Sequence, residues 1–230
     1  MAQKKKRNPR YVSDIGIAVY PYLLEPDEYK GKLDYKTKLK LDTDAQVKNA
    51  KGESLGSMAE FLDKAADASY EKFKEKFKGK LNSKGKPIKV ERADPYYFDD
   101  TGAMICSFKL AAHVEPENGK PFTQSPAIFD SKGKPFDGDK LWGGSKLRIS
   151  FEVIPYHIMS SGDASVSLRM KAVQVLELNQ GGNQQADSFG FGEEEGYESS
   201  GASAEEEGFG SEEGESSDEP FETTDENGDF

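Results

Sequence analysis

The stretch LDYKTKLKL, residues 33–41, carries the clearest two-residue repeat in the chain. One side of the repeat comprises Leu33, Tyr35, Thr37, Leu39 and Leu41, and the other comprises Asp34, Lys36, Lys38 and Lys40. Because successive side chains of a β-strand point to opposite faces, this pattern predicts a strand with one face in a core. The lysines would then form a row that faces water or a ligand.

The same alternation continues outward in other segments. We interpret 15–24, 104–114, 146–154 and 166–178 as further long strands, and 127–136 as a short strand entering a loop. Pro21 has no backbone N–H to give to a neighbouring strand, so the first of these is expected at an edge or at a bulge. The last changes its apolar parity partway along, which also predicts a bulge.

One helix is predicted between the second and third long strands. Ser57 and Glu60 have the spacing of a capping box, in which each side chain satisfies the other's free backbone donor. Apolar and small residues then recur every three or four positions, at Met58, Phe61, Leu62, Ala65, Ala66, Ser69, Phe73 and Phe77. Gly79 supplies a stop signal, so the helix should cover residues 58–77 and place one apolar face on a core.

Together these elements predict a mainly β fold. Five main strands, one helix and frequent turns are typical of a five-stranded antiparallel barrel, closed or half-closed, that is capped by one α-helix.

The charges divide the chain into three parts. Residues 181–230 contain 17 Asp or Glu and no Lys or Arg, whereas residues 1–180 contain 31 basic and 25 acidic residues, a net charge of +6. The Gly, Ser and acidic composition of the last part offers too little apolar surface to offset the entropy of ordering it. We therefore expect a basic N-terminal arm (1–12), one globular domain (13–180) and a disordered acidic tail (181–230), with a polyanion as the partner of the basic body.

Several functional classes lack the residues they need. Two histidines and one cysteine cannot form a Cys/His metal site, and Gly143–Gly144–Ser145 lacks the pattern of a phosphate-binding loop. We therefore predict no enzyme, no metal site and no cofactor. The lone Cys106 fits a reducing compartment, and no stretch approaches the ~18–20 apolar residues of a membrane span, so a cytoplasmic protein without membrane contact is expected.

Binding to single-stranded nucleic acid is a function that these residues do allow, because it needs only a row of cations and flat side chains on which bases stack. Stacking contributes about 1–3 kcal/mol per base. The candidate DNA-binding residues are Lys36, Lys38, Lys40, Lys109, Lys132, Lys134, Lys146, Arg148, Tyr20, Tyr22, Trp142 and Tyr156. Further cations and aromatics on the strands and loops are Arg169, Lys171, Tyr96, Tyr97 and Phe98. Taken singly, a lysine row is often a solvated strand face and an aromatic is usually a core residue. The prediction rests on their occurring together in a basic body with an acidic tail.

The tail has two predicted roles. With about 50 Gly-rich residues it spans roughly 40 Å, so it can reach back over the basic face and compete with nucleic acid. Its end, Asp229–Phe230, combines an aromatic ring with two carboxylates and would fit a pocket with an apolar floor and a basic rim on a partner.

Segments in order along the chain carry a resemblance to a family. They are VYPYLLEPDEY (19–29), YKTKLKL (35–41), the helix 58–77, PYYFDDTG (95–102), IFDSKGKPF (128–136), GGSKLRISFEVIPY (143–156), GDASVSLRMKAVQVLEL (162–178) and ENGDF (226–230). On these segments the chain resembles the phage-encoded single-stranded DNA-binding proteins of the podovirus replisome type.

The resemblance implies an OB-fold that binds single-stranded DNA with little sequence preference during phage DNA replication, recombination and repair, in the cytoplasm of the infected host. It also implies strand annealing, a possible homodimer, and contacts of the tail with the phage DNA polymerase and helicase–primase through Phe230. One feature departs from the usual OB layout, since two strands rather than three precede the predicted helix. An acidic-tailed interaction protein and an RNA-binding OB module remain as alternatives.

Overall fold

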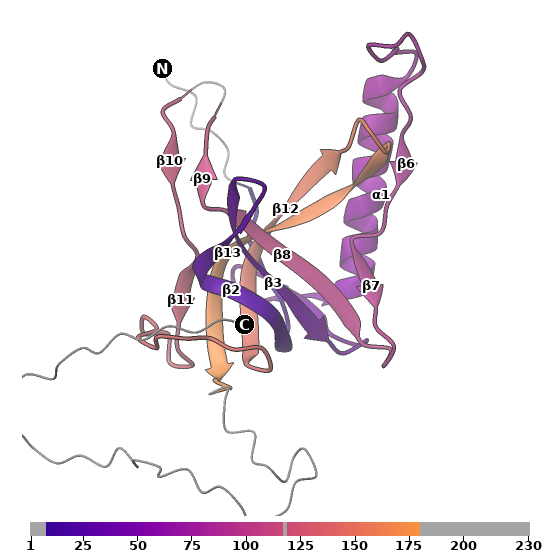
Figure 1. Ribbon diagram of the computed structural model, residues 1–230. Helices are drawn as coiled ribbons and strands as arrows, with labels where there is room; N and C mark the ends of the chain where they lie inside the picture. Colours follow the sequence, from indigo (N-terminus) through magenta and orange to yellow (C-terminus); the bar gives the residue numbers. More distant parts are fainter. Residues whose placement is uncertain (1–7, 117–118, 180–230) are drawn as a thin grey trace, which may run out of the picture. The chain divides into compact units, whose positions relative to one another are not determined.

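A closed ring of five long strands forms the barrel in the computed structural model, which describes residues 8–116 and 119–179 (Figure 1). The strands are β2 (Gly16–Tyr29), β3 (Lys32–Leu41), β8 (Met104–Ala111), β12 (Lys146–His157) and β13 (Asp163–Glu177). Their order is β2-β3-β8-β13-β12, and the ring closes because β12 pairs with both β13 and β2. The expected fold class, a mainly β OB-fold-like barrel with one helix, is confirmed, and two barrel strands precede the helix as expected.

One pairing within the ring differs from the expected antiparallel pattern. β8 and β13 run parallel, with Leu168 opposite Phe108 and Arg169 opposite Lys109. The two strands are not consecutive, because β12 lies between them in the sequence. β13 runs antiparallel to β12, and this leaves it pointing in the same direction as β8 on its other side. Residue alternation alone does not distinguish the two directions.

Both predicted bulges are present. The register of β2 against β3 shifts between Val19 and Tyr22, and Tyr20 takes the left-handed conformation with φ of 50°. In β13 the partner of Ser150 is Ala172 but the partner of Phe151 is Met170, so Lys171 is the extra residue. These irregularities redirect side chains at two points where the barrel bends.

Eight short strands complete the fold. They are β1 (Tyr11–Val12), β4 (Gln46–Asn49), β5 (Ser54–Ser57), β6 (Glu91–Arg92), β7 (Tyr96–Phe98), β9 (His113–Val114), β10 (Phe122–Thr123) and β11 (Ala127–Phe129). Only β11 was predicted as a separate element, as the start of the short strand 127–136. Segments of two to four residues are too short to show a period.

β1 falls in the expected arm, yet it pairs with β12 and β4, and the Tyr11 ring lies 4.7 Å from that of Phe61.

The helix α1 (Met58–Phe77) has the predicted bounds, but its predicted capping box is wrong. The Ser57 side chain makes no capping hydrogen bond, because Ser57 is the last residue of β5 and pairs with Gln46. The backbone N–H of Met58 instead donates to the carbonyl of Ala45 at 2.8 Å. At the other end Gly79 adopts φ of 70°, as a helix stop requires.

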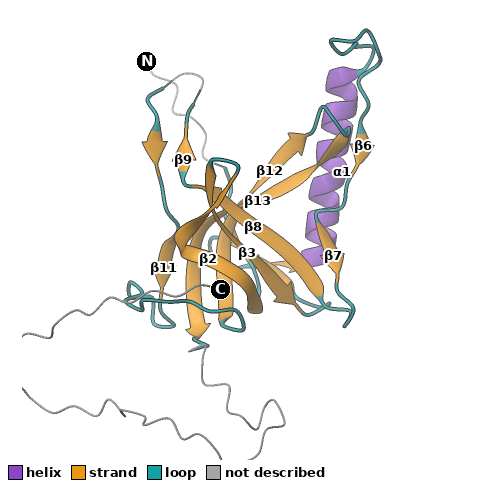
Figure 2. Cartoon of the chain, viewed as in Figure 1, coloured by secondary structure: helices purple, strands orange, loops and turns teal. Residues whose placement is uncertain are grey.

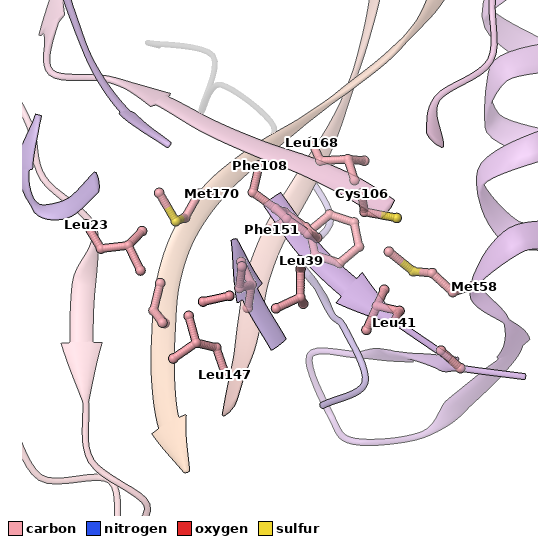
Figure 3. Close-up of a cluster of buried hydrophobic side chains, with 14 of the residues drawn as sticks. Leu23, Leu39, Leu41, Met58, Cys106, Phe108, Leu147, Phe151, Leu168 and Met170 are labelled. Carbon is pink, nitrogen blue, oxygen red and sulfur yellow. The ribbon is translucent and has the colours of Figure 1, made fainter. Parts of the chain in front are cut away.

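The helix lies beside the barrel (Figure 2), and a core of buried side chains fills the barrel and extends to the helix (Figure 3). Phe108 and Phe151 meet edge to face, with ring centroids 5.3 Å apart, among leucines of β3 and β12, and Met58 adds a side chain from α1. Cys106 is buried here, and burial raises the pKa of its thiol to about 12. In the part of the chain that the structure describes, no helix is long and apolar enough to cross a membrane.

Candidate nucleic-acid interface

A row of polar side chains crosses all five barrel strands in register. Tyr22 on β2 pairs with Lys36 on β3, which pairs with Lys109 on β8. Lys109 in turn lies opposite Arg169 on β13, and Arg169 lies opposite Glu152 on β12. Three members of this row were candidates from the sequence, and the closed ring brings them together from segments far apart in the chain.

A hollow of about 370 Å³ lies over the first part of this row. Five of the twelve candidates line it: Tyr20, Tyr22, Lys36, Lys38 and Lys109. Tyr20 is 74% exposed because the left-handed bulge residue precedes Pro21 and leaves the continuous ladder. An exposed ring between lysines provides both a stacking face and charge.

Two further hollows adjoin the first because they share lining residues with it. Tyr22 also lines a hollow of about 220 Å³ with Trp142, whose ring is 45% exposed and lies 5.6 Å from the Lys140 ammonium. Lys109 also lines a hollow of about 940 Å³ together with Arg10, Phe122, Arg169 and Lys171. We call these three adjoining hollows, from Trp142 through Tyr22 and Lys109 to Lys171, the barrel groove.

Three of the seven groove cations, Lys36, Lys109 and Arg169, are held by carboxylates of the same domain. Lys36 pairs with Asp27 at 2.5 Å and Lys109 with Asp34 at 2.7 Å. The hydrogen bond from Lys36 to Asp27 raises the pKa of Lys36, so this amine stays charged. The side chains of Lys36 and Lys109 are 43% and 56% exposed, so an incoming phosphate can reach both ammonium groups and replace the carboxylates.

Lys38 and Lys40 have different surroundings. Lys38 donates a hydrogen bond of 3.1 Å to the Tyr97 hydroxyl and lies 5.4 Å from the centre of that ring. Lys40 pairs with Asp99 at 2.7 Å and lines none of the three groove hollows. Hydrogen bonds from Lys40 and Thr101 lower the pKa of Asp99 far below its usual range.

The remaining candidates lie elsewhere on the domain. Arg148 lines a separate hollow of about 360 Å³ beside Gly133, which stands between Lys132 and Lys134 in the turn after β11. Lys146 pairs with Glu177 at 2.5 Å. Tyr156 is half-buried near the end of β12. None of these residues lines the groove, and Asp229 and Phe230 lie outside the described residues.

Apart from the buried Phe108, five cations and aromatics that line the groove were not among the twelve candidates: Arg10, Phe122, Lys140, Arg169 and Lys171. Arg169 and Lys171 stand on a predicted strand and belong to the further cations identified from the sequence. Arg10 lies in the expected arm, and Phe122 belongs to the two-residue strand β10, so no periodic signal points to either. Among residues 8–116 and 119–179, no cluster of His, Cys, Asp or Glu could hold a metal ion.

Comparison with known proteins adds a family match. Residues 16–178 match the family model described as single-stranded DNA-binding protein, bacteriophage T7. The single-stranded DNA-binding protein of Escherichia phage T7 is 32% identical over 148 residues, which are 63% of this chain and 64% of that protein. The corresponding protein of Enterobacteria phage T3 is 28% identical over 178 residues, 73% of this chain and 75% of that protein.

A solved structure is also similar. The crystal structure of a single-stranded DNA-binding protein encoded by bacteriophage T7 superposes with a TM-score of 0.63 at 26% identity. The superposition covers 84% of this chain and 100% of that chain. In sequence, however, the matched segment spans slightly less than two thirds of the T7 relative's length.

Proposed function

The chain belongs to the family of the bacteriophage T7 single-stranded DNA-binding protein, and from this premise we propose that it binds single-stranded DNA in the barrel groove with little sequence preference. The observation that carries the proposal is the in-register row Tyr22–Lys36–Lys109–Arg169. The row places cations on neighbouring strands across one face. A phosphate backbone that crosses this face would meet a cation on each of β3, β8 and β13.

The aromatic residues of the groove support a stacking role. Tyr20, Tyr22 and Trp142 are each exposed, and they stand at one end of the row. Bases of any identity have a flat face, so stacking on these rings stabilises the complex without reading sequence. Neighbouring strands lie about 4.8 Å apart, so four steps across the ring span about 19 Å. That length suits the lower part of the range of about 4–16 nucleotides per OB domain.

Binding of a strand would exchange the ion pairs within the groove for ion pairs with phosphates. Asp27, Asp34 and Glu152 hold Lys36, Lys109 and Arg169 when no strand is bound. A bound strand would substitute phosphates for these carboxylates and release its own counterions. The affinity should therefore fall as salt rises, with a logarithmic slope of about −0.7 for each phosphate contacted.

The acidic tail (181–230) would compete for the same groove. Its 17 carboxylates and lack of any cation support this role. A strand that displaces the tail would leave Asp229 and Phe230 available to partners, for which the phage DNA polymerase and helicase–primase are our candidates. In this proposal the chain acts without catalysis in replication, recombination and repair, promotes annealing of complementary strands, and forms a homodimer.

Intrinsic fluorescence tests the central claim, because Trp142 and the exposed tyrosines are themselves the stacking residues. Oligo-dT should quench the emission, whereas duplex DNA at equal phosphate concentration should not, since its bases are already stacked on each other. Emission that stays unchanged with oligo-dT at low salt would contradict the proposal and favour an acidic-tailed interaction protein. RNA of matched sequence that binds more tightly would favour an RNA-binding module.

A further inference from the structure

The positive charge of the domain is concentrated outside the barrel groove. Residues 72–89 contain eight lysines and one glutamate, a net charge of +7, whereas residues 1–180 as a whole carry only +6. These lysines lie on the last turns of α1 and on the turn that follows it, and all of them are exposed. We call the eight lysines between residues 72 and 89 the helix-end patch.

Most lysines of the helix-end patch differ in their pairing from Lys36, Lys109 and Arg169, the cations of the in-register row. Lys74 contacts Glu71 at 3.4 Å and Lys89 contacts Glu91 at 2.7 Å. Within the described residues the other six form no ion pair with a carboxylate: Lys72, Lys76, Lys78, Lys80, Lys84 and Lys86. Two cations in the last turn would complement the helix dipole, so the dipole does not account for a patch of this size.

The helix-end patch offers charge without free stacking faces. Phe73 and Phe77 stack on each other with ring centroids 6.0 Å apart, and both contact the His157 ring, at 5.6 Å and 4.8 Å. Lys76 lies over both phenyl rings, at 5.6 Å and 5.4 Å. The half-buried rings are thus occupied by protein groups. A surface of this kind suits a polyanion whose bases are hidden, which is the situation in duplex DNA.

The position of the patch favours DNA over the chain's own acidic tail. Asn179, the last described residue, follows the C-terminal end of β13, whereas the patch adjoins the N-terminal end of that strand, where Glu91 pairs with Asp163 (Figure 1). Fourteen residues of extended strand separate these ends, about 46 Å at 3.3 Å per residue. This distance exceeds the span of roughly 40 Å expected for the tail, so the groove lies within easier reach of the tail than the patch does. The groove residue Arg169 lies only five residues from Ala164, about 17 Å. Duplex continuing from a strand in the groove would reach the patch within about half a helical turn.

We propose that the helix-end patch binds the phosphate backbone of duplex DNA, so that the protein prefers a junction between single-stranded and double-stranded DNA. The junction preference rests on the proposed single-strand groove, whereas the patch itself contacts only the duplex part. The expected preference is about tenfold at low salt over an oligonucleotide with the same single-stranded length.

The test compares two full-length variants of equal charge. The patch variant carries Lys76→Gln, Lys80→Gln and Lys84→Gln, and the control variant carries Lys51→Gln, Lys64→Gln and Lys120→Gln, three exposed lysines elsewhere. Fluorescence anisotropy measures binding of each to labelled oligo-dT and to a junction with the same oligo-dT overhang, over a range of salt. The patch variant should lose the junction preference and reduce the junction salt slope by about 2–3, since each duplex phosphate contributes about 0.9. The control variant should keep the preference.

The outcomes separate this proposal from the single-strand function. Wild-type protein that binds oligo-dT but shows no junction preference would overturn the patch proposal and leave the groove proposal standing. A patch variant that loses oligo-dT affinity as strongly as junction affinity would overturn it too, because the patch would then belong to the single-strand site. Zero-length amine–carboxylate crosslinking of the DNA-free protein tests whether the acidic tail (181–230) occupies the helix-end patch instead. Crosslinks from the tail that concentrate on Lys76, Lys80 and Lys84 would identify the tail and overturn the proposal.

Discussion

Lys36 and Lys109 lie directly opposite each other on β3 and β8, and a different aspartate binds each ammonium group. Two like charges in such a pair would repel each other. Asp27 and Asp34 remove that repulsion while no ligand is bound, and both lysines remain at the surface. The pair therefore keeps two cations close together without destabilising the sheet.

Asp34→Asn should tighten binding of single-stranded DNA. The substitution removes the carboxylate that holds Lys109 at 2.7 Å, so a phosphate no longer has to displace it. We expect affinity for oligo-dT at low salt to rise about threefold to tenfold, a gain of about 1 kcal/mol. Anisotropy titration measures this, with Asp44→Asn as a control for the change in net charge. Equal effects of the two substitutions would show that only total charge matters.

Tyr20→Ala should weaken binding to oligo-dT by about 1–3 kcal/mol, which is the loss of one stacking face. Tyr20→Phe should retain affinity within about twofold, since the ring rather than the hydroxyl does the stacking. Tyr29→Ala is the matched control, because Tyr29 is also exposed but lines none of the three groove hollows. Fluorescence quenching at fixed salt compares the three, and a loss with Tyr29→Ala equal to that with Tyr20→Ala would argue against a localised site.

The groove lysines and the outlying lysines should differ in salt dependence. Lys38→Gln with Lys109→Gln should reduce the salt slope for oligo-dT by about 1.4, at about 0.7 per phosphate contact. Lys132→Gln with Lys134→Gln changes the charge equally, but these lysines stand on the turn after β11 and should leave the slope unchanged. The opposite result would move the single-strand site to the hollow beside Arg148.

Gly16→Ala should lower the free energy of unfolding by about 1–3 kcal/mol, because it overpacks the barrel. A Cβ atom at Gly16 would lie 2.6 Å from the Lys40 carbonyl oxygen and 2.7 Å from Cγ of Leu39. At Gly143 the nearest atom would be 3.7 Å away, so Gly143→Ala is the control. Urea denaturation followed by circular dichroism measures both, and equal stability of the two variants would contradict the close packing at Gly16.

The thiol of Cys106 should react only when the protein unfolds. Burial raises its pKa from 9.0 to about 12, so the folded state keeps the proton through a range in which the unfolded state loses it. The contribution of this group to stability is therefore complete below pH 9 and falls as the pH rises toward 12. Thiol titration with a disulfide reagent at pH 8 should give no reaction without denaturant and one thiol with it. Rapid reaction of the folded protein would show that the site opens.

The helix-end patch shows why the net charge of residues 1–180 does not locate the strand-binding face. The net charge of +6 was interpreted as a basic strand-binding face, yet residues 72–89 carry +7. In the groove, by contrast, carboxylates hold Lys36, Lys109 and Arg169. Composition counts charges but does not state which ones neutralise each other, because ion pairs join residues that are distant in the sequence.

The sequence by itself determined which segments become the five long strands and the helix, and which of their faces enter the core. Alternation over 33–41 and the spacing of apolar residues over 58–77 are local properties, and the barrel and α1 follow them. The bulge in β13 and the helix stop at Gly79 were also predicted from local sequence, and both were confirmed.

Only the tertiary structure decided which candidates share a site. Ring closure through β12 and the parallel pairing of β8 with β13 place Lys109 beside Arg169, sixty residues apart, and the bulge in β2 turns Tyr20 outward. The same closure leaves Lys132, Lys134, Lys146, Arg148 and Tyr156 away from the groove. The register between strands that are distant in the sequence depends on how whole faces pack together. Alternation within one strand does not indicate which strand pairs with it.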